Sequence, residues 1–240
     1  MRIRAVLCDI DGVLLNSIPP ALEIVKTILI SQGVEWTEKR EEEFRKIAGF
    51  RLTEYFTVLF PNQSFEQARA SWRVIQQQII PSTIPAFPYA TRAIRSLKKL
   101  KLLVVLATNR QAASFPDHAG SHPPWLDLAD AIQTLGKRSP KLHPRHLTTK
   151  WAKPNGKALH PAIQWLKMRG VPKHEIVFVG DSLADLIAAY ENHLRFIGVL
   201  TGTIDTQERW ILWAREYNIS LATENIIPSI REFPEWIQHQ

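Results

Sequence analysis

Two aspartates close a short apolar run near the start of the chain. Residues 4–8 suit a buried strand, and Asp9, Asp11 and Gly12 follow directly. Residues i and i+2 of a strand share a face, so both carboxylates would lie at the strand's carboxyl end, where open α/β sheets bind ligands. Two carboxylates this close repel each other unless a cation or a shared proton intervenes. The pair therefore indicates a functional site; the alternative is a solvent-exposed turn after the strand.

Two further apolar runs end in polar residues that suit phosphate or metal. The runs are residues 102–107 and 175–179. The polar residues that follow them are Thr108, Asn109, Asp181 and Asp185. Lys153 lies between the two runs, before a helix predicted over 156–169. Carboxylates are the hard oxygen ligands that magnesium prefers, while a hydroxyl and an ammonium group can compensate phosphoryl oxygens.

This ordered set of motifs resembles the haloacid dehalogenase-like (HAD) hydrolase superfamily, and most of all its phosphoglycolate phosphatase-like and β-phosphoglucomutase-like members. The resemblance covers nearly the whole chain. It implies an α/β fold: a Rossmann-like three-layer α/β/α core with a parallel sheet, formed by residues 1–16 and 86–240. Residues 17–85, in which apolar residues recur at helical spacing, would form an inserted α-helical cap; the alternative is that these helices pack on the sheet.

The resemblance also implies a role for each residue. Asp9 would attack phosphorus and form an aspartyl-phosphate, and Asp11 would be the general acid and then the general base. Thr108 and Lys153 would complete the catalytic set. The metal would be Mg²⁺, held by the Asp9 carboxylate, the Asp11 backbone carbonyl and Asp181, with Asp185 either binding it or orienting the other ligands. Asn109 and Arg51 are the predicted substrate-binding residues.

We therefore predict a magnesium-dependent phosphatase that hydrolyses a phosphomonoester of a small metabolite. Asp11 favours phosphate chemistry over dehalogenation, because only an alcohol leaving group needs its proton. One alternative is a mutase that resembles β-phosphoglucomutase, in which Arg51 would hold a second phosphate. The other is a non-catalytic protein that binds partners through a basic face.

Composition narrows the class of protein. The chain has 240 residues, a formal net charge of +7 and one cysteine, Cys8, so an internal disulfide framework is excluded. No apolar run approaches the length that spans a membrane, and the amino terminus lacks the layout of a signal peptide. These features predict a cytoplasmic protein with no membrane partner. Cys8 would point away from Asp9 and into packing.

The positive charge is concentrated in one segment. Residues 131–174 contain no Asp or Glu but ten Lys and Arg residues. This asymmetry suggests an anionic partner. The phosphorylated substrate, steered toward Lys153, is the first candidate. Nucleic acid bound through residues 137–173 is the second, and an ordinary solvated face is the alternative. The oligomeric state is not predicted.

The second half of the chain is predicted in less detail. We expect a helix over 125–135, then a long basic loop over 136–152. Strands are expected at 195–200 and 219–222, with a helix between them and an amphipathic helix at the end.

Overall fold

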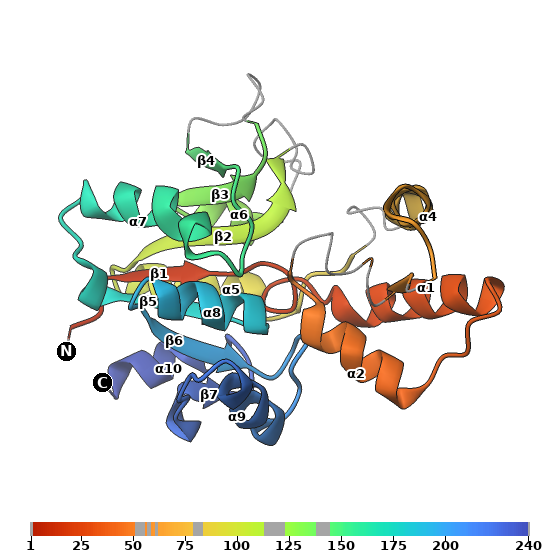
Figure 1. Cartoon of the computed structure of the whole chain (residues 1–240). Helices are drawn as coiled ribbons and strands as arrows, with labels where there is room; N and C mark the ends of the chain where they lie inside the picture. Colours follow the sequence, from red (N-terminus) through yellow and green to blue (C-terminus); the bar gives the residue numbers. More distant parts are fainter. Residues whose placement is uncertain are drawn as a thin grey trace.

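A seven-stranded parallel sheet forms the centre of the molecule (Figure 1). The computed structural model describes residues 2–50, 56, 59–60, 62–78, 84–112, 123–137 and 145–239. The strand order is β4-β3-β2-β1-β5-β6-β7. The strands are β1 (Ala5–Cys8), β2 (Leu103–Gln111), β3 (Ala131–Leu135), β4 (His146–Thr149), β5 (Ile176–Gly180), β6 (Arg195–Val199) and β7 (Ile226–Ile227). The predicted parallel α/β sheet is confirmed.

Helices cover both faces of this sheet. On one face lie α7 (His160–Lys167), α8 (Leu183–Glu191) and α9 (Gln207–Glu216). On the other lie α5 (Ala90–Lys99), α6 (Pro124–Leu128) and α10 (Phe233–Gln238). Short 3₁₀ turns η3 (Gly156–Leu159), η4 (Lys173–Glu175) and η5 (Thr223–Asn225) lead into α7, β5 and β7. The core therefore has the three layers that the sequence predicted.

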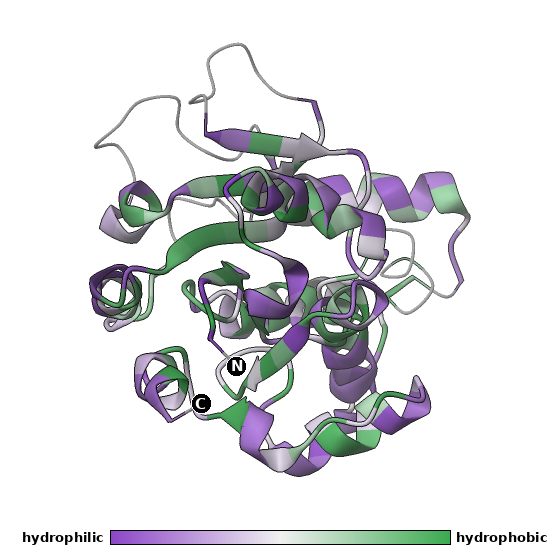
Figure 2. Cartoon of the chain, turned by 90° about the vertical axis from the view of Figure 1, so that its left-hand side faces the viewer, coloured by the Kyte–Doolittle hydropathy of each residue, from purple (hydrophilic) through white to green (hydrophobic). Residues whose placement is uncertain are grey.

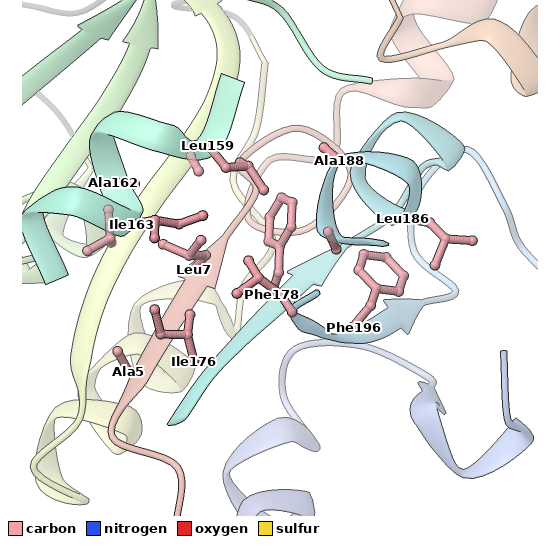
Figure 3. Packing of buried hydrophobic residues seen from close by; sticks show 14 of the residues in the cluster. Ala5, Leu7, Leu159, Ala162, Ile163, Ile176, Phe178, Leu186, Ala188 and Phe196 are labelled. Carbon is pink, nitrogen blue, oxygen red and sulfur yellow. The ribbon is translucent and has the colours of Figure 1, made fainter. Parts of the chain in front are cut away.

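Alternation along each buried strand builds a separate core on each face. In β1, Leu7 packs with Phe178 and the α7–α8 side, whereas Cys8 packs with the α5 side. Figure 3 shows Leu7, Phe178 and Phe196 pointing toward residues of α7 and α8. Figure 2 shows long green stretches in the central strands and mixed purple and green turns in the surrounding helices. Cys8 is buried packing, as predicted from its place in the strand.

Helices α1 (Ile18–Ser31), α2 (Glu38–Ile47) and α4 (Phe65–Gln78) lie between β1 and β2 in sequence. They extend beyond the carboxyl ends of the strands (Figure 1). Their apolar faces form a third cluster, separate from the two cores of the sheet. The backbone N–H of Asn16 donates to Pro85 O, so both connections to the core run side by side. We call the described residues between 17 and 85 the helical insertion.

Helix α2 begins after Thr37, whose hydroxyl accepts a hydrogen bond from the Arg40 N–H and so caps the helix. Arg51 lies outside the described residues. The domain bounds 17–85 stay a prediction.

Three predictions in the second half of the chain were wrong. The expected helix over 125–135 is the short α6 followed by β3, and the expected loop over 136–152 contains β4. β3 (AIQTL) and β4 (HLTT) are too short, and contain too many polar residues, to show a period that separates strand from helix or loop. Residues 219–222 form no strand; the last strand, β7, comes later in the chain.

No helix among the described residues is long and apolar enough to cross a bilayer.

Trp210 on α9 offers a test of this packing. It is fully buried against Phe196 and Gly198, and its indole N–H donates to Val199 O at 3.2 Å. We expect Trp210→Ala to lower the free energy of unfolding by about 3–5 kcal/mol, because it leaves a cavity and an orphaned carbonyl. Leu212→Ala on the same helix, where the side chain is 58% exposed, should cost less than about 1 kcal/mol. Urea unfolding of both variants measures the difference, and equal losses would contradict it.

Candidate active site

The predicted site residues gather at the carboxyl ends of three neighbouring strands. Asp9 follows β1, Thr108 lies near the end of β2, and Asp181 follows β5. β1 pairs with both β2 and β5, so these ends share one edge of the sheet. This is the edge at which open α/β sheets bind ligands.

Three buried carboxylates crowd this edge. Asp9, Asp181 and Asp185 each place an oxygen within 4.8 Å of the others, and this is the only acidic grouping of its kind among the described residues. Burial, and then the charge of Asp185, raise the pKa of Asp9 to about 7. The same two causes, in the same order, raise the pKa of Asp181 well above its usual range. The three carboxyl groups therefore resist full ionisation together, because that would place more negative charge in a buried site than Lys153 neutralises.

Lys153 supplies the positive charge inside this cluster. Its Nζ lies 2.5 Å from Asp185 Oδ1 and 2.9 Å from Asp9 Oδ1, and it donates to Ala107 O at 3.0 Å. The side chain is 3% exposed. Burial alone would lower the pKa of Lys153, but the charges of Asp185 and Asp9 outweigh it and raise that pKa. Lys153 is a fixed cation beside the predicted nucleophile.

Asp185 has both of its oxygens engaged by protein donors. While Oδ1 binds Lys153, Oδ2 accepts from Ser182 Oγ at 2.7 Å and from the Ser182 N–H at 3.2 Å. Ser182 and Asp185 form the capping box that starts α8. The local sequence thus fixes Asp185, and Asp185 in turn fixes the ammonium group of Lys153.

Asp181 sits between two glycines. A Cβ at Gly202 would come within 1.9 Å of Asp181 Oδ2, and one at Gly12 within 2.2 Å. Gly12 also has a φ of 69°, where other residues are strained. The Thr203 N–H donates to Asp181 Oδ2 at 2.8 Å. Glycine is therefore required on both sides for this carboxylate to reach the cluster.

Asp11 is paired with an arginine that the sequence analysis missed. Arg110 donates from Nε to Asp11 Oδ2 and from Nη2 to Asp11 Oδ1, both at 2.7 Å. Burial lowers the pKa of Arg110, but Asp11 outweighs this and raises it. The Arg110 N–H also donates to Thr108 Oγ1 at 3.1 Å. The sequence signal that could have identified Arg110 is its position directly after Thr108 and Asn109 at the end of a predicted strand.

Asn109 binds protein groups in this structure. Its Nδ2 donates to Gly49 O at 2.7 Å and to Lys153 O at 3.0 Å, and its Oδ1 accepts from the Lys153 N–H at 2.8 Å. Both amide hydrogens are thus in use. The predicted substrate contacts of Asn109 and Arg51 stay predictions, and Arg51 lies outside the described residues.

The basic segment is only partly a free surface. Arg145 donates to the backbone carbonyls of Leu126, Asp127 and Ala129, so it fastens α6. Lys153 is buried in the site. Lys150 and Lys157 are exposed and place their ammonium groups 5.4 and 4.9 Å from the centroid of the Trp151 ring. Arg138 and Lys141 lie outside the described residues.

Comparisons with known proteins agree with this fold. The family model "haloacid dehalogenase-like hydrolase" matches residues 3–191. A predicted phosphatase from Clostridium acetobutylicum has 20% identity and a TM-score of 0.69, with 100% of both chains covered. A proposed phosphoglycolate phosphatase from Lactobacillus plantarum has 17% identity and a TM-score of 0.66, covering 98% of this chain and 100% of that one.

A proposed β-phosphoglucomutase from Bacteroides vulgatus has 17% identity and a TM-score of 0.64, covering 99% of this chain and 90% of that one. No protein of curated function matches the sequence. At these identities the solved structures show the fold, whereas the family model matches well over half of the chain. With its motifs at the carboxyl edge of a three-layer fold, the chain belongs to the haloacid dehalogenase-like hydrolases.

Proposed function

We propose that this protein is a phosphatase that hydrolyses a phosphomonoester of a small metabolite through a phosphorylated Asp9, with Mg²⁺ as its cofactor. One observation carries the proposal. Asp9 lies beside a buried ammonium group and two further buried carboxylates, while Asp11 lies two residues away on the same strand end. A carboxylate nucleophile, a fixed cation and a proton carrier are the groups that phosphoryl transfer needs.

In the first half of the proposed reaction, an Asp9 oxygen attacks phosphorus. The P–O bond to the leaving alcohol breaks, and Asp11 gives that oxygen a proton. Lys153 and the Thr108 hydroxyl compensate the charge on the phosphoryl oxygens. The product is an acyl phosphate on Asp9 and a free alcohol.

In the second half, water attacks the same phosphorus. Asp11 takes a proton from that water, and the bond between phosphorus and the Asp9 oxygen breaks, which releases inorganic phosphate. The pair with Arg110 suits this half, because the two guanidinium bonds hold the Asp11 carboxylate in one orientation at the strand end. Before the first half, Asp11 must turn at least one oxygen from Arg110 to the leaving group.

The residues fit a magnesium ion. The donor set is hard oxygen from Asp9, Asp181 and the Asp11 backbone carbonyl, with Asp185 orienting Lys153. Burial, and then the charge of Asp185, raise the pKa values of Asp9 and Asp181, so ionising both carboxyl groups in this buried site calls for a cation in addition to Lys153. When bound, Mg²⁺ would neutralise charge on the transferring phosphoryl group.

The helical insertion would act as a cap over this site, because it extends beyond the strand ends that carry the catalytic residues (Figure 1). The exposed Lys150 and Lys157 are candidates for steering an anionic substrate. A cytoplasmic location remains part of the proposal, and nucleic acid stays the second candidate for an anionic partner of residues 137–173.

Asp9→Asn tests the nucleophile. An amide cannot form the acyl phosphate, so turnover of a generic aryl phosphate should fall by about 10³-fold or more while circular dichroism stays that of the native protein. Arg4→Gln, which breaks an ion pair with Glu175 at the far end of the sheet, is the control and should keep native turnover. Release of inorganic phosphate, as opposed to an isomerised sugar phosphate, separates a phosphatase from a mutase. Native turnover in Asp9→Asn would sink the mechanism.

The raised pKa of Asp9 predicts a pH-dependent metal response. The pKa of Asp9 is about 7 in the folded protein, against an ordinary 3.8, so the folded protein binds this proton more tightly than the unfolded chain does. The resulting contribution to the stability of the fold is fully present below about pH 4. That stability is lost as the pH rises through 7. In chelator, the melting temperature should therefore fall between pH 5 and 8. Added Mg²⁺ should raise it more at pH 8, where the free carboxylates bind metal, by about 1–3 kcal/mol of stability at saturating metal.

Scanning calorimetry with and without Mg²⁺ at the two pH values measures this response. In Asp9→Asn both the pH slope and the magnesium shift should shrink. Asp205→Asn, on the exposed loop before α9, should leave them as in the native protein. A magnesium shift that is equal at both pH values and in both variants would count against the site.

A further inference from the structure

Gly49 of the helical insertion touches the core at the two groups that hold Lys153. Its carbonyl accepts from Asn109, which also binds the backbone of Lys153 through two hydrogen bonds. Its Cα faces Ser182, since a Cβ at Gly49 would lie 2.9 Å from Ser182 Oγ. With a φ of 89°, Gly49 also has a backbone conformation that favours glycine. The close approach therefore depends on this residue type.

Both contacts lead to Lys153. Ser182 Oγ donates to Asp185 Oδ2 at 2.7 Å, and Asp185 Oδ1 lies 2.5 Å from Lys153 Nζ. Asn109 fixes the other end of the same lysine, its peptide group. One glycine of the insertion is thus in contact with the residues that fix both the backbone and the ammonium group of the only cation inside the described acidic cluster.

The rest of the docking surface is weaker. Arg45 and Lys46, in the last turn of α2, pair with Asp205 and Glu216, and Lys46 lies 5.9 Å from the centroid of the Trp213 ring. These groups are partly exposed, and such ion pairs contribute about 0–1 kcal/mol each. Phe50 packs on the core cluster of the α7–α8 face. An interface of this kind can open without unfolding either part.

We propose that Asn109 is a positioning residue that makes the placement of Lys153 depend on the docking of the helical insertion at Gly49. With the insertion docked, the Asn109 amide is saturated and holds the Lys153 peptide in one orientation. Undocking removes the shortest of its three bonds and uncovers Ser182. The catalytic consequence rests on the proposed function, whereas the coupling is a property of the contacts themselves.

The variant Asn109→Asp tests the two hydrogen bonds that the amide donates separately from the one that it accepts. It keeps an oxygen that accepts from the Lys153 N–H, but it turns a second oxygen toward the carbonyls of Gly49 and Lys153. We expect amide hydrogen exchange over residues 44–50 to speed up about tenfold in the folded protein, and kcat on an aryl phosphate to fall about 10–100-fold with a smaller change in KM.

Asn155→Asp is the matched control. Asn155 lies two residues after Lys153. Its side-chain oxygen caps η3 by accepting from the Lys157 N–H at 2.9 Å. Aspartate caps a helical turn equally well, so exchange over 44–50 and turnover should stay native.

A double-mutant cycle with Gly49→Ala tests the coupling from the other side. Gly49→Ala should also speed exchange over 44–50 and lower kcat, because the added methyl group meets Ser182. If both changes break one contact, the double variant should be no slower than the worse single variant. Additive losses, native exchange over 44–50 in Asn109→Asp, or faster exchange with native kcat would each overturn the proposal. If the native protein shows no Asp9-dependent hydrolysis, the proposed function fails, and the exchange measurements alone decide the docking contact.

Discussion

The buried charge of Lys153 is the constraint on which the site depends. An ammonium group that is 3% exposed is costly to remove from water unless carboxylates surround it. Asp185 and Asp9 meet this need, and the capping box of α8 holds Asp185 in place. The first turn of an ordinary helix thereby determines where the buried cation lies. Removing either partner would leave an uncompensated charge inside the protein, which typically costs several kcal/mol.

The same charge balance explains why glycines flank the site. Three carboxyl groups face one lysine, so ionising all of them would leave the site anionic and would favour a further cation. Asp181 can approach that point only because Gly12 and Gly202 bring their bare backbones against it. These two glycines come from the loops after β1 and β6, far apart in the chain. Packing around one carboxylate thus joins the two ends of the core, and the Thr201 hydroxyl strengthens the join by donating to Gly12 O at 2.7 Å.

The sequence was sufficient to predict those site residues that follow directly after a predicted strand. Asp9, Thr108 and Asp181 each follow a short apolar run, and parallel strands must bring such ends to one edge. The role of Arg110 was missed because its partner, Asp11, lies 99 residues away in the sequence. No local sequence pattern predicts that these two residues pair. The link between Asn109 and Gly49 was missed for the same reason. β3 and β4 were missed because strands of five and four residues that include polar side chains are too short to show a strand period.

The placement of Gly49 gives a physical reason for an insertion between β1 and β2. An acyl phosphate is useful only if water reaches it after the alcohol has left, so the site must close for the first half-reaction and admit water for the second. A docking surface built from partly exposed ion pairs, one aromatic side chain and one short hydrogen bond suits repeated opening. A large apolar interface would hold the insertion shut. Because Asn109 binds Gly49 and Lys153 through the same amide group, opening would also loosen the cation that compensates the transferring phosphoryl group. The insertion would then control solvent access and charge compensation together, which favours transfer to Asp9 in the closed state.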